Sequence, residues 1–155
     1  MVGALDAGLR LLGRRAHASA ELRLKLARRG HGPAEIDAAL ARLGELGYLD
    51  DRSFAEGHVR RRSSGRGPRA LAQELASRGV ERSVADGAVA GFGAEAQLAS
   101  ATQLAERLYG RRPSPGYREM LNTIGAKLLR RGFSPAVARA ACLATWRGAQ
   151  AQTEA

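Results

Sequence analysis

One five-residue pattern, Leu-x-x-Arg-Gly, occurs three times in the chain. It reads LARRG at Leu26–Gly30, LASRG at Leu75–Gly79 and LLRRG at Leu128–Gly132, with separations of 49 and 53 residues. Neighbouring positions agree as well: Leu22, Leu71 and Ile124 stand eight residues before the glycine, and Ala39, Ala88 and Ala141 stand nine after it. So many coincidences at fixed offsets predict an internal repeat.

The physical meaning of the pattern is a pair of helices joined by a glycine turn. Apolar residues eight and four positions before the glycine lie on one helical face and predict a buried stripe. Glycine takes the left-handed conformation that ends a helix, and an arginine in the last turn meets the negative end of the helix dipole. The plainest alternative for each arginine is that it caps helix carbonyls and otherwise stays in water.

A further helix precedes each pair. In the first copy it spans residues 5–14, with Leu5, Leu9 and Leu12 as its apolar stripe; in the third copy it spans residues 94–109. In the second copy it follows Asp50, a good N-cap residue. The predicted fold is therefore all-α, with three tandem three-helix repeats in an elongated array that could be curved. The expected boundaries are residues 1–47, 48–92 and 93–149, followed by a disordered tail at residues 150–155.

The apolar composition suits several thin cores better than one thick core. Of the 155 residues 45% are apolar, but 31 of them are alanine. The longest run without charge is ten residues, 96–105, too short to span a membrane. The single cysteine, Cys142, stands at an inner position of the repeat, so we expect a core residue in a reducing compartment. We expect a soluble, cytoplasmic protein.

The chain is strongly basic, with 25 lysine and arginine residues against 15 acidic residues and a net charge of +10. Such a field attracts polyanions, and nucleic acid is the first candidate. The alternative is a solvated basic protein without a specific ligand.

Two stretches concentrate the basic side chains. RRRSSGRGPR places five arginines around a predicted helix end and loop, namely Arg60, Arg61, Arg62, Arg66 and Arg69. KLLRR adds Lys127, Arg130 and Arg131. Arginines interleaved with serine and glycine suit phosphate oxygens or an acidic protein surface. The alternative is an ordinary solvated helix terminus.

No pattern in the chain indicates enzyme chemistry. The histidines His17, His31 and His58 are far apart in sequence and lack cysteine partners, so we expect no metal site and no cofactor. Asp50 and Asp51 are adjacent, so their side chains point apart, and helix capping explains Asp50 better than a catalytic pair. We therefore expect no catalytic residues.

Three segments resemble the RecX family of regulators of RecA recombinase. The central segment at residues 47–80, GYLDDRSFAEGHVRRRSSGRGPRALAQELASRGV, is the most characteristic. Residues 9–30 and residues 129–142 are similar to the N-terminal and C-terminal repeats of that family. His31-Gly32 and the loop GRRPSPG at residues 110–116 depart from the usual pattern.

The resemblance implies a non-enzymatic regulator, built of tandem three-helix repeats, that acts in recombinational DNA repair and the SOS response. It would bind the RecA filament on single-stranded DNA, with weak sequence-independent binding to duplex DNA. It would inhibit filament extension, ATPase activity, strand exchange and repressor cleavage. The two basic stretches would contact RecA or DNA, and we expect a monomer. The alternative is a transcription regulator of helix-turn-helix type, since a helix, a glycine turn and a second helix also build that motif.

Overall fold

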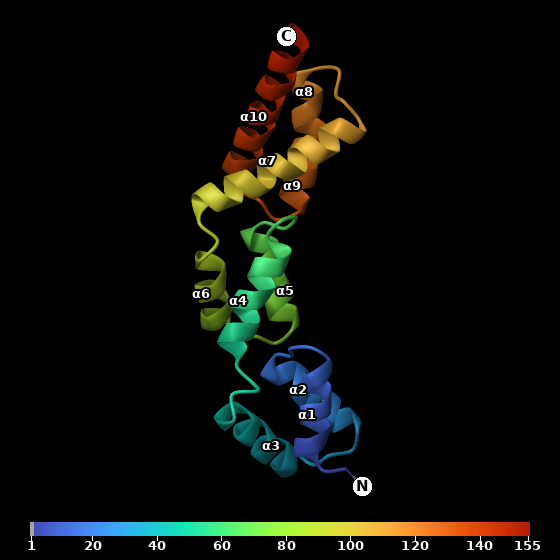
Figure 1. Ribbon diagram of the computed structural model, residues 1–155, viewed down its shortest axis with the longest axis vertical. Coiled ribbons are helices and arrows are strands. Elements are labelled where there is room, and N and C mark those ends of the chain that lie inside the picture. Colours follow the sequence, from blue (N-terminus) through green and yellow to red (C-terminus); the bar gives the residue numbers. More distant parts are fainter. Residues whose placement is uncertain (1) are drawn as a thin grey trace. The chain divides into compact units, whose positions relative to one another are not determined.

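The computed structural model describes residues 2–155, and this part of the chain is helical with no β-strand (Figure 1). The helices are α1 (Ala4–Arg14), α2 (Ser19–Arg28), α3 (Pro33–Glu45), α4 (Asp51–Arg62), α5 (Pro68–Ser77), α6 (Arg82–Ala90), α7 (Ala94–Arg111), α8 (Tyr117–Met120), the π-helical turn η1 (Leu121–Gly125), α9 (Ala126–Arg130) and α10 (Pro135–Glu154). α8, η1 and α9 follow one another without a break. The all-α prediction is confirmed.

The three pattern glycines end their helices as the sequence predicts. Gly30, Gly79 and Gly132 have φ angles of 91°, 78° and 95°, the left-handed region. After each glycine the next N–H donates back to the carbonyl of the pattern leucine, from His31 to Leu26 (3.3 Å), from Val80 to Leu75 (3.1 Å) and from Phe133 to Leu128 (3.1 Å). This is the Schellman motif, which satisfies carbonyls that a helix end leaves unpaired. Gly47 ends α3 in the same way, with φ 81°.

Two of these glycines also allow a close approach to another helix. A Cβ at Gly79 would lie 2.5 Å from Cβ of Ala20 in α2. A Cβ at Gly132 would lie 2.4 Å from the backbone N of Ala70 in α5. Around Gly30, by contrast, no other atom lies within 4 Å of such a Cβ. The end of α5 thus lies against the start of α2, and the end of α9 lies against the start of α5.

The chain forms two compact units. The first comprises Met1–His58 with Glu74–Ala88, and the second comprises Val59–Gln73 with Val89–Ala155. The boundary falls inside α4, α5 and α6, so the middle predicted repeat contributes to both units. The division of the sequence at residues 47 and 92 remains a proposal.

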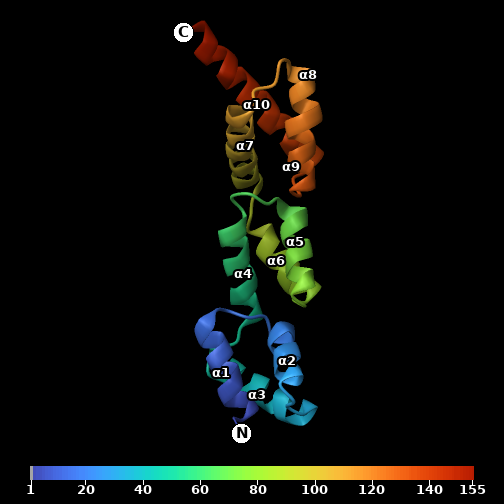
Figure 2. The ribbon, with the colours of Figure 1, turned by 90° about the vertical axis from the view of Figure 1, so that its right-hand side faces the viewer.

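In the first unit, α1, α2 and α3 pack together (Figure 2). Leu22, Leu26 and Leu43 are fully buried there. The predicted stripe on α1 is wrong by part of a turn: Ala4, Ala7 and Leu11 are buried, whereas Leu5, Leu9 and Leu12 pack at the edges of the core. Small alanine side chains let α1 approach α3 closely, which places the larger leucines at the flanks.

In the second unit, α10 packs against α7 and against α8, η1 and α9 (Figures 1 and 2). Met120, Leu128 and Cys142 are completely buried, which confirms the prediction that Cys142 is a core residue. Burial raises the pKa of the Cys142 thiol. α10 continues to Glu154, so residues 150–154, expected as part of a disordered tail, are helical.

Candidate nucleic-acid interface

The loop between α4 and α5 lies against the end of α9. The N–H of Gly67 donates to the carbonyl of Arg131 (2.7 Å), and the N–H of Arg69 donates to the carbonyl of Gly132 (3.2 Å). A Cβ at Gly67 would lie 2.4 Å from the carbonyl carbon of Gly132, so only glycine permits this approach. The two basic stretches, more than 50 residues apart in sequence, are therefore joined through their backbones.

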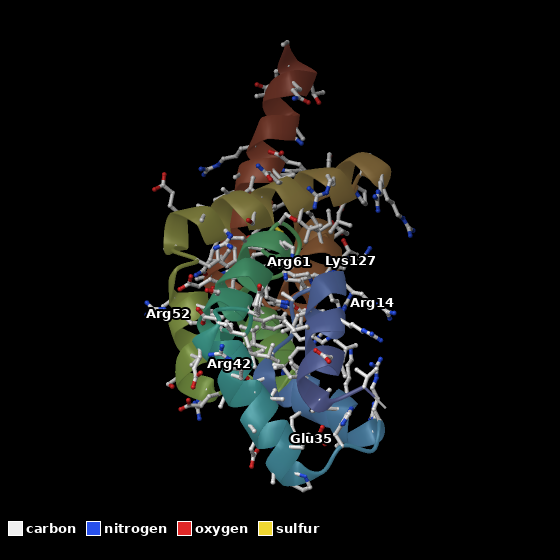
Figure 3. All side chains as sticks on the ribbon, turned by 60° about the horizontal axis from the view of Figure 1, so that its bottom comes forward. Arg14, Glu35, Arg42, Arg52, Arg61 and Lys127 are labelled. Atoms are coloured by element: carbon white, nitrogen blue, oxygen red, sulfur yellow. The ribbon has the colours of Figure 1, made fainter. Side chains whose placement is uncertain are left out.

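We call the eight residues of these two stretches the basic surface. Seven of its side chains are exposed, and Arg66 is half-buried. Arg61 of α4 and Lys127 of α9 are labelled in Figure 3. The full set is Arg60, Arg61, Arg62, Arg66, Arg69, Lys127, Arg130 and Arg131.

Arg131 is at the junction of the two stretches. Its Nη1 donates to the carbonyl of Gly65 (3.3 Å), and Nη1 of Arg66 donates to the same oxygen (3.3 Å). Slight desolvation of the Arg131 guanidinium lowers its pKa, and the positive charges of Arg66, Arg107 and Arg62 lower it further. Several guanidinium groups therefore lie close enough to Arg131 to repel its positive charge. Such a concentration of like charge favours an anionic ligand, because a phosphate relieves the repulsion.

Arg107 of α7 is the member of this group that sequence reasoning missed. It stands near the end of α7, 24 residues before Arg131, with no other basic residue among the three neighbours on either side. Only the packing of α7 in the second unit brings its charge near Arg131. No local signal in the sequence could have found it.

The arginines of the repeated pattern have different roles. Arg78 Nη1 donates to Glu21 Oε2 (3.0 Å), and Arg15 Nη2 donates to the same oxygen (2.7 Å). Arg131 bonds to Gly65, as described above. Arg29 is an exposed C-cap residue. Arg78 and Arg131 therefore do more than cap a helix, because each also joins its helix end to a preceding segment.

Glu21 is held ionised by this arrangement. Burial of its carboxylate raises the pKa, but the hydrogen bond from Arg15 and the charges of Arg15, His17 and Arg78 outweigh it and hold the pKa at about 2. In the first unit this carboxylate is paired with both Arg15 and Arg78. We assign it to stability.

Two of the three histidines, His17 and His58, occupy buried, hydrogen-bonded positions. His17 Nδ1 lies 2.9 Å from the carbonyl of Arg15, and its Nε2 lies 2.9 Å from Lys25 Nζ. His58, stacked on Phe54, lies with Nε2 3.0 Å from Glu74 Oε2. Within residues 2–155 no group of three His, Cys, Asp or Glu side chains is arranged to hold a metal ion. Over the same residues, no helix has the length and apolar character that crossing a membrane requires.

Fold and surface together define a class: an all-α protein of repeated helix–glycine–helix units with a basic surface formed by two of its helix ends. Residues 4–43 match the family model for RecX, first three-helix domain, and residues 50–89 match that for RecX, second three-helix domain. The chain belongs to the RecX family of regulatory proteins, as its resemblance to that family predicts.

Named relatives resemble the chain over most of its length. A "Regulatory protein RecX" of Halorhodospira halophila is 44% identical over 143 residues, which cover 90% of this chain and 86% of that protein. One of Mycolicibacterium vanbaalenii is 42% identical over 138 residues, covering 84% and 75%. The crystal structure of RecX from Lactobacillus salivarius matches with a TM-score of 0.83 over 92% of this chain and 94% of that one. At 24% identity, that likeness shows the fold.

Proposed function

We propose that this protein binds RecA filaments on single-stranded DNA and inhibits their activities: filament extension, ATP hydrolysis, strand exchange and repressor cleavage. The proposal rests on membership of a family of regulatory proteins, on the resemblance described above and on the basic surface. The observation that carries it is the hydrogen bond between Gly67 and Arg131, which joins two basic stretches into one surface.

The basic surface would hold the phosphates of the filament's DNA strand. Arginine and lysine contacts to phosphate position a protein along a strand without reading its sequence, and they give an affinity that falls as salt rises. Because seven of the eight side chains are exposed, they can reach phosphates without a change of fold. No catalytic step is part of this function, since inhibition requires only occupancy of the filament.

The test is the RecA ATPase on single-stranded DNA, with this protein titrated below the RecA concentration. The paired substitution Arg61→Glu with Arg130→Glu should raise the concentration for half-inhibition roughly tenfold or more, because it reverses two charges of the basic surface. The control pair, Arg118→Glu with Arg139→Glu, makes the same change of charge at exposed positions outside the surface. Equal inhibition by the two pairs would remove the basic surface from the proposal.

The helix-turn-helix alternative is separated by a mobility shift with duplexes of different sequence. Weak, salt-sensitive binding that ignores sequence is the outcome expected for a filament regulator. In the alternative, α6 would be the helix of the middle repeat that reads bases. It carries one arginine, Arg82, whose Nε lies 3.7 Å from Oδ2 of Asp86. Sequence-selective binding would favour the alternative.

A further inference from the structure

A cavity of about 440 Å³ lies in the second unit, between the end of α7, the loop at residues 112–116 and the helix formed by α8, η1 and α9. This loop is part of the GRRPSPG segment that departs from the RecX pattern. The helix lines the cavity with one face, because Glu119, Thr123, Lys127 and Arg130 recur at intervals of three or four residues. A volume of this size is within the range of small-molecule sites.

Three residues that line the cavity are cationic. Arg112 from the loop and Lys127 and Arg130 from α9 line it, and all three are exposed and thus accessible to a ligand. The one acidic lining residue, Glu119, lies close to Gly116 at the start of α8, since a Cβ there would lie 2.5 Å from its Oε2. Three cations against one carboxylate favour an anionic group such as phosphate.

The cavity also has apolar lining residues, namely Leu108, Pro113, Pro115 and Ile124. Proline and leucine side chains give a surface against which a flat ring can lie. Asn122 and Thr123 also line the cavity, and their amide and hydroxyl can hydrogen-bond the edge of such a ring. Asn122, Thr123 and Ile124 all belong to η1, and single π-helical turns occur frequently at functional sites.

An anionic group, a flat ring and a polar ring edge together describe a nucleotide. We propose that this cavity binds one nucleotide unit, with its phosphate at Arg112, Lys127 and Arg130 and its base against the apolar lining residues. Lys127 and Arg130 also belong to the basic surface, so a strand held there can place one base in the cavity. If the bound nucleotide is part of the filament's DNA, the inference rests on the proposed function. A free nucleotide would present the same phosphate and base to the cavity.

The test compares the wild-type chain with Asn122→Trp, which fills the cavity without changing charge, and with Arg112→Ala, which removes a phosphate partner from an exposed loop position. Gln103→Trp and Arg111→Ala are the matched controls, because both positions are exposed and neither lines the cavity. Circular dichroism establishes that all four variants keep the helical content of the wild type.

The first probe is a labelled oligothymidylate of about 12 nucleotides, measured by fluorescence anisotropy beside an abasic strand of equal length. Wild type should bind the thymidylate strand roughly 5- to 30-fold more tightly than the abasic strand, since a seated base adds stacking. Asn122→Trp should abolish most of this difference, and Gln103→Trp should keep it. Arg112→Ala should weaken binding of both strands more than Arg111→Ala does.

The second probe is thymidine monophosphate, followed by amide chemical shifts in wild type and in Asn122→Trp. Thymidine monophosphate should shift the amide signals of the cavity residues in wild type but not in Asn122→Trp if the ligand is a free nucleotide. If the ligand is DNA, Asn122→Trp should instead lose the preference for the thymidylate strand over the abasic strand. If neither probe distinguishes the cavity variants from their controls, the inference is wrong. If the probes do not distinguish the variants but the wild-type protein inhibits RecA, the cavity inference fails and the proposed function stands. If the cavity binds the probes but the protein does not inhibit RecA, the proposed function fails and the cavity inference stands.

Discussion

The carboxylate of Asp51 caps a helix that begins 32 residues earlier. Its Oδ1 accepts hydrogen bonds from the backbone N–H of Ser19 (2.7 Å) and from the Ser19 hydroxyl (3.0 Å). The residue at the N-cap of α2 is Ala18, which has no side-chain acceptor of its own. The neighbouring Asp50 caps its own helix, accepting from the N–H groups of Arg52 (3.0 Å) and Ser53 (3.2 Å). Two adjacent aspartates therefore serve two different helices.

Asp51→Ala should lower the free energy of unfolding by about 1–2 kcal/mol, because α2 loses the side-chain cap that Asp51 supplies. Asp51→Asn keeps an acceptor oxygen and should cost clearly less. Urea denaturation of the two variants measures the difference. The cap would be unimportant if alanine and asparagine at this position had the same stability.

Substituting alanine for the glycines of the repeated pattern should lower the free energy of unfolding by unequal amounts. Gly30→Ala should cost about 1 kcal/mol, since only the left-handed backbone is penalised. Gly132→Ala should cost about 2–4 kcal/mol, because the added Cβ also overlaps the backbone of Ala70. The difference between the two variants in one denaturation series isolates the contact between α9 and α5. Similar costs would show that this contact is loose in solution.

Glu21 should make the protein sensitive to acid. Its folded pKa of about 2 is below its ordinary value of 4.5, so its contribution is complete above pH 4.5 and is lost as the pH falls toward 2. In Glu21→Gln, the free energy of unfolding should therefore fall less over this pH range, by on the order of 1–2 kcal/mol. This figure is kept small because the arginine partners are partly exposed, so solvent weakens the interaction. Glu45→Gln, which changes an exposed carboxylate, is the control. Parallel curves for wild type and Glu21→Gln would contradict the assignment.

Arg131→Ala should separate binding from stability. The substitution removes one hydrogen bond to Gly65 and also removes repulsion from Arg66, Arg107 and Arg62, so the free energy of unfolding should change by less than about 1 kcal/mol. Affinity for single-stranded DNA should fall, and the slope of log affinity against log salt should become shallower by about 0.7, the value for one phosphate contact. An unchanged slope would place Arg131 outside the DNA contact.

The positions of the helices were largely predictable, because helix formation and termination are local. Leucines at helical spacing, an arginine and a left-handed glycine define Gly30, Gly79 and Gly132 as helix ends without reference to the rest of the chain. The first helix was predicted at residues 5–14 and is Ala4–Arg14, yet its buried face was misjudged. Which side of α1 is buried depends on how closely α3 approaches, and alanine spacing does not reveal that distance.

The sequence by itself determined the helix ends, the all-α class and the two stretches where basic side chains concentrate. Only the tertiary structure decided that Gly67 lies against Gly132, that Arg107 acts on Arg131 and that Asp51 caps α2. Each of these relationships joins residues far apart in the chain, and the first of them depends on glycines small enough to let two backbones meet. Local chemistry fixes where a helix stops, whereas excluded volume between distant segments fixes what that helix end touches.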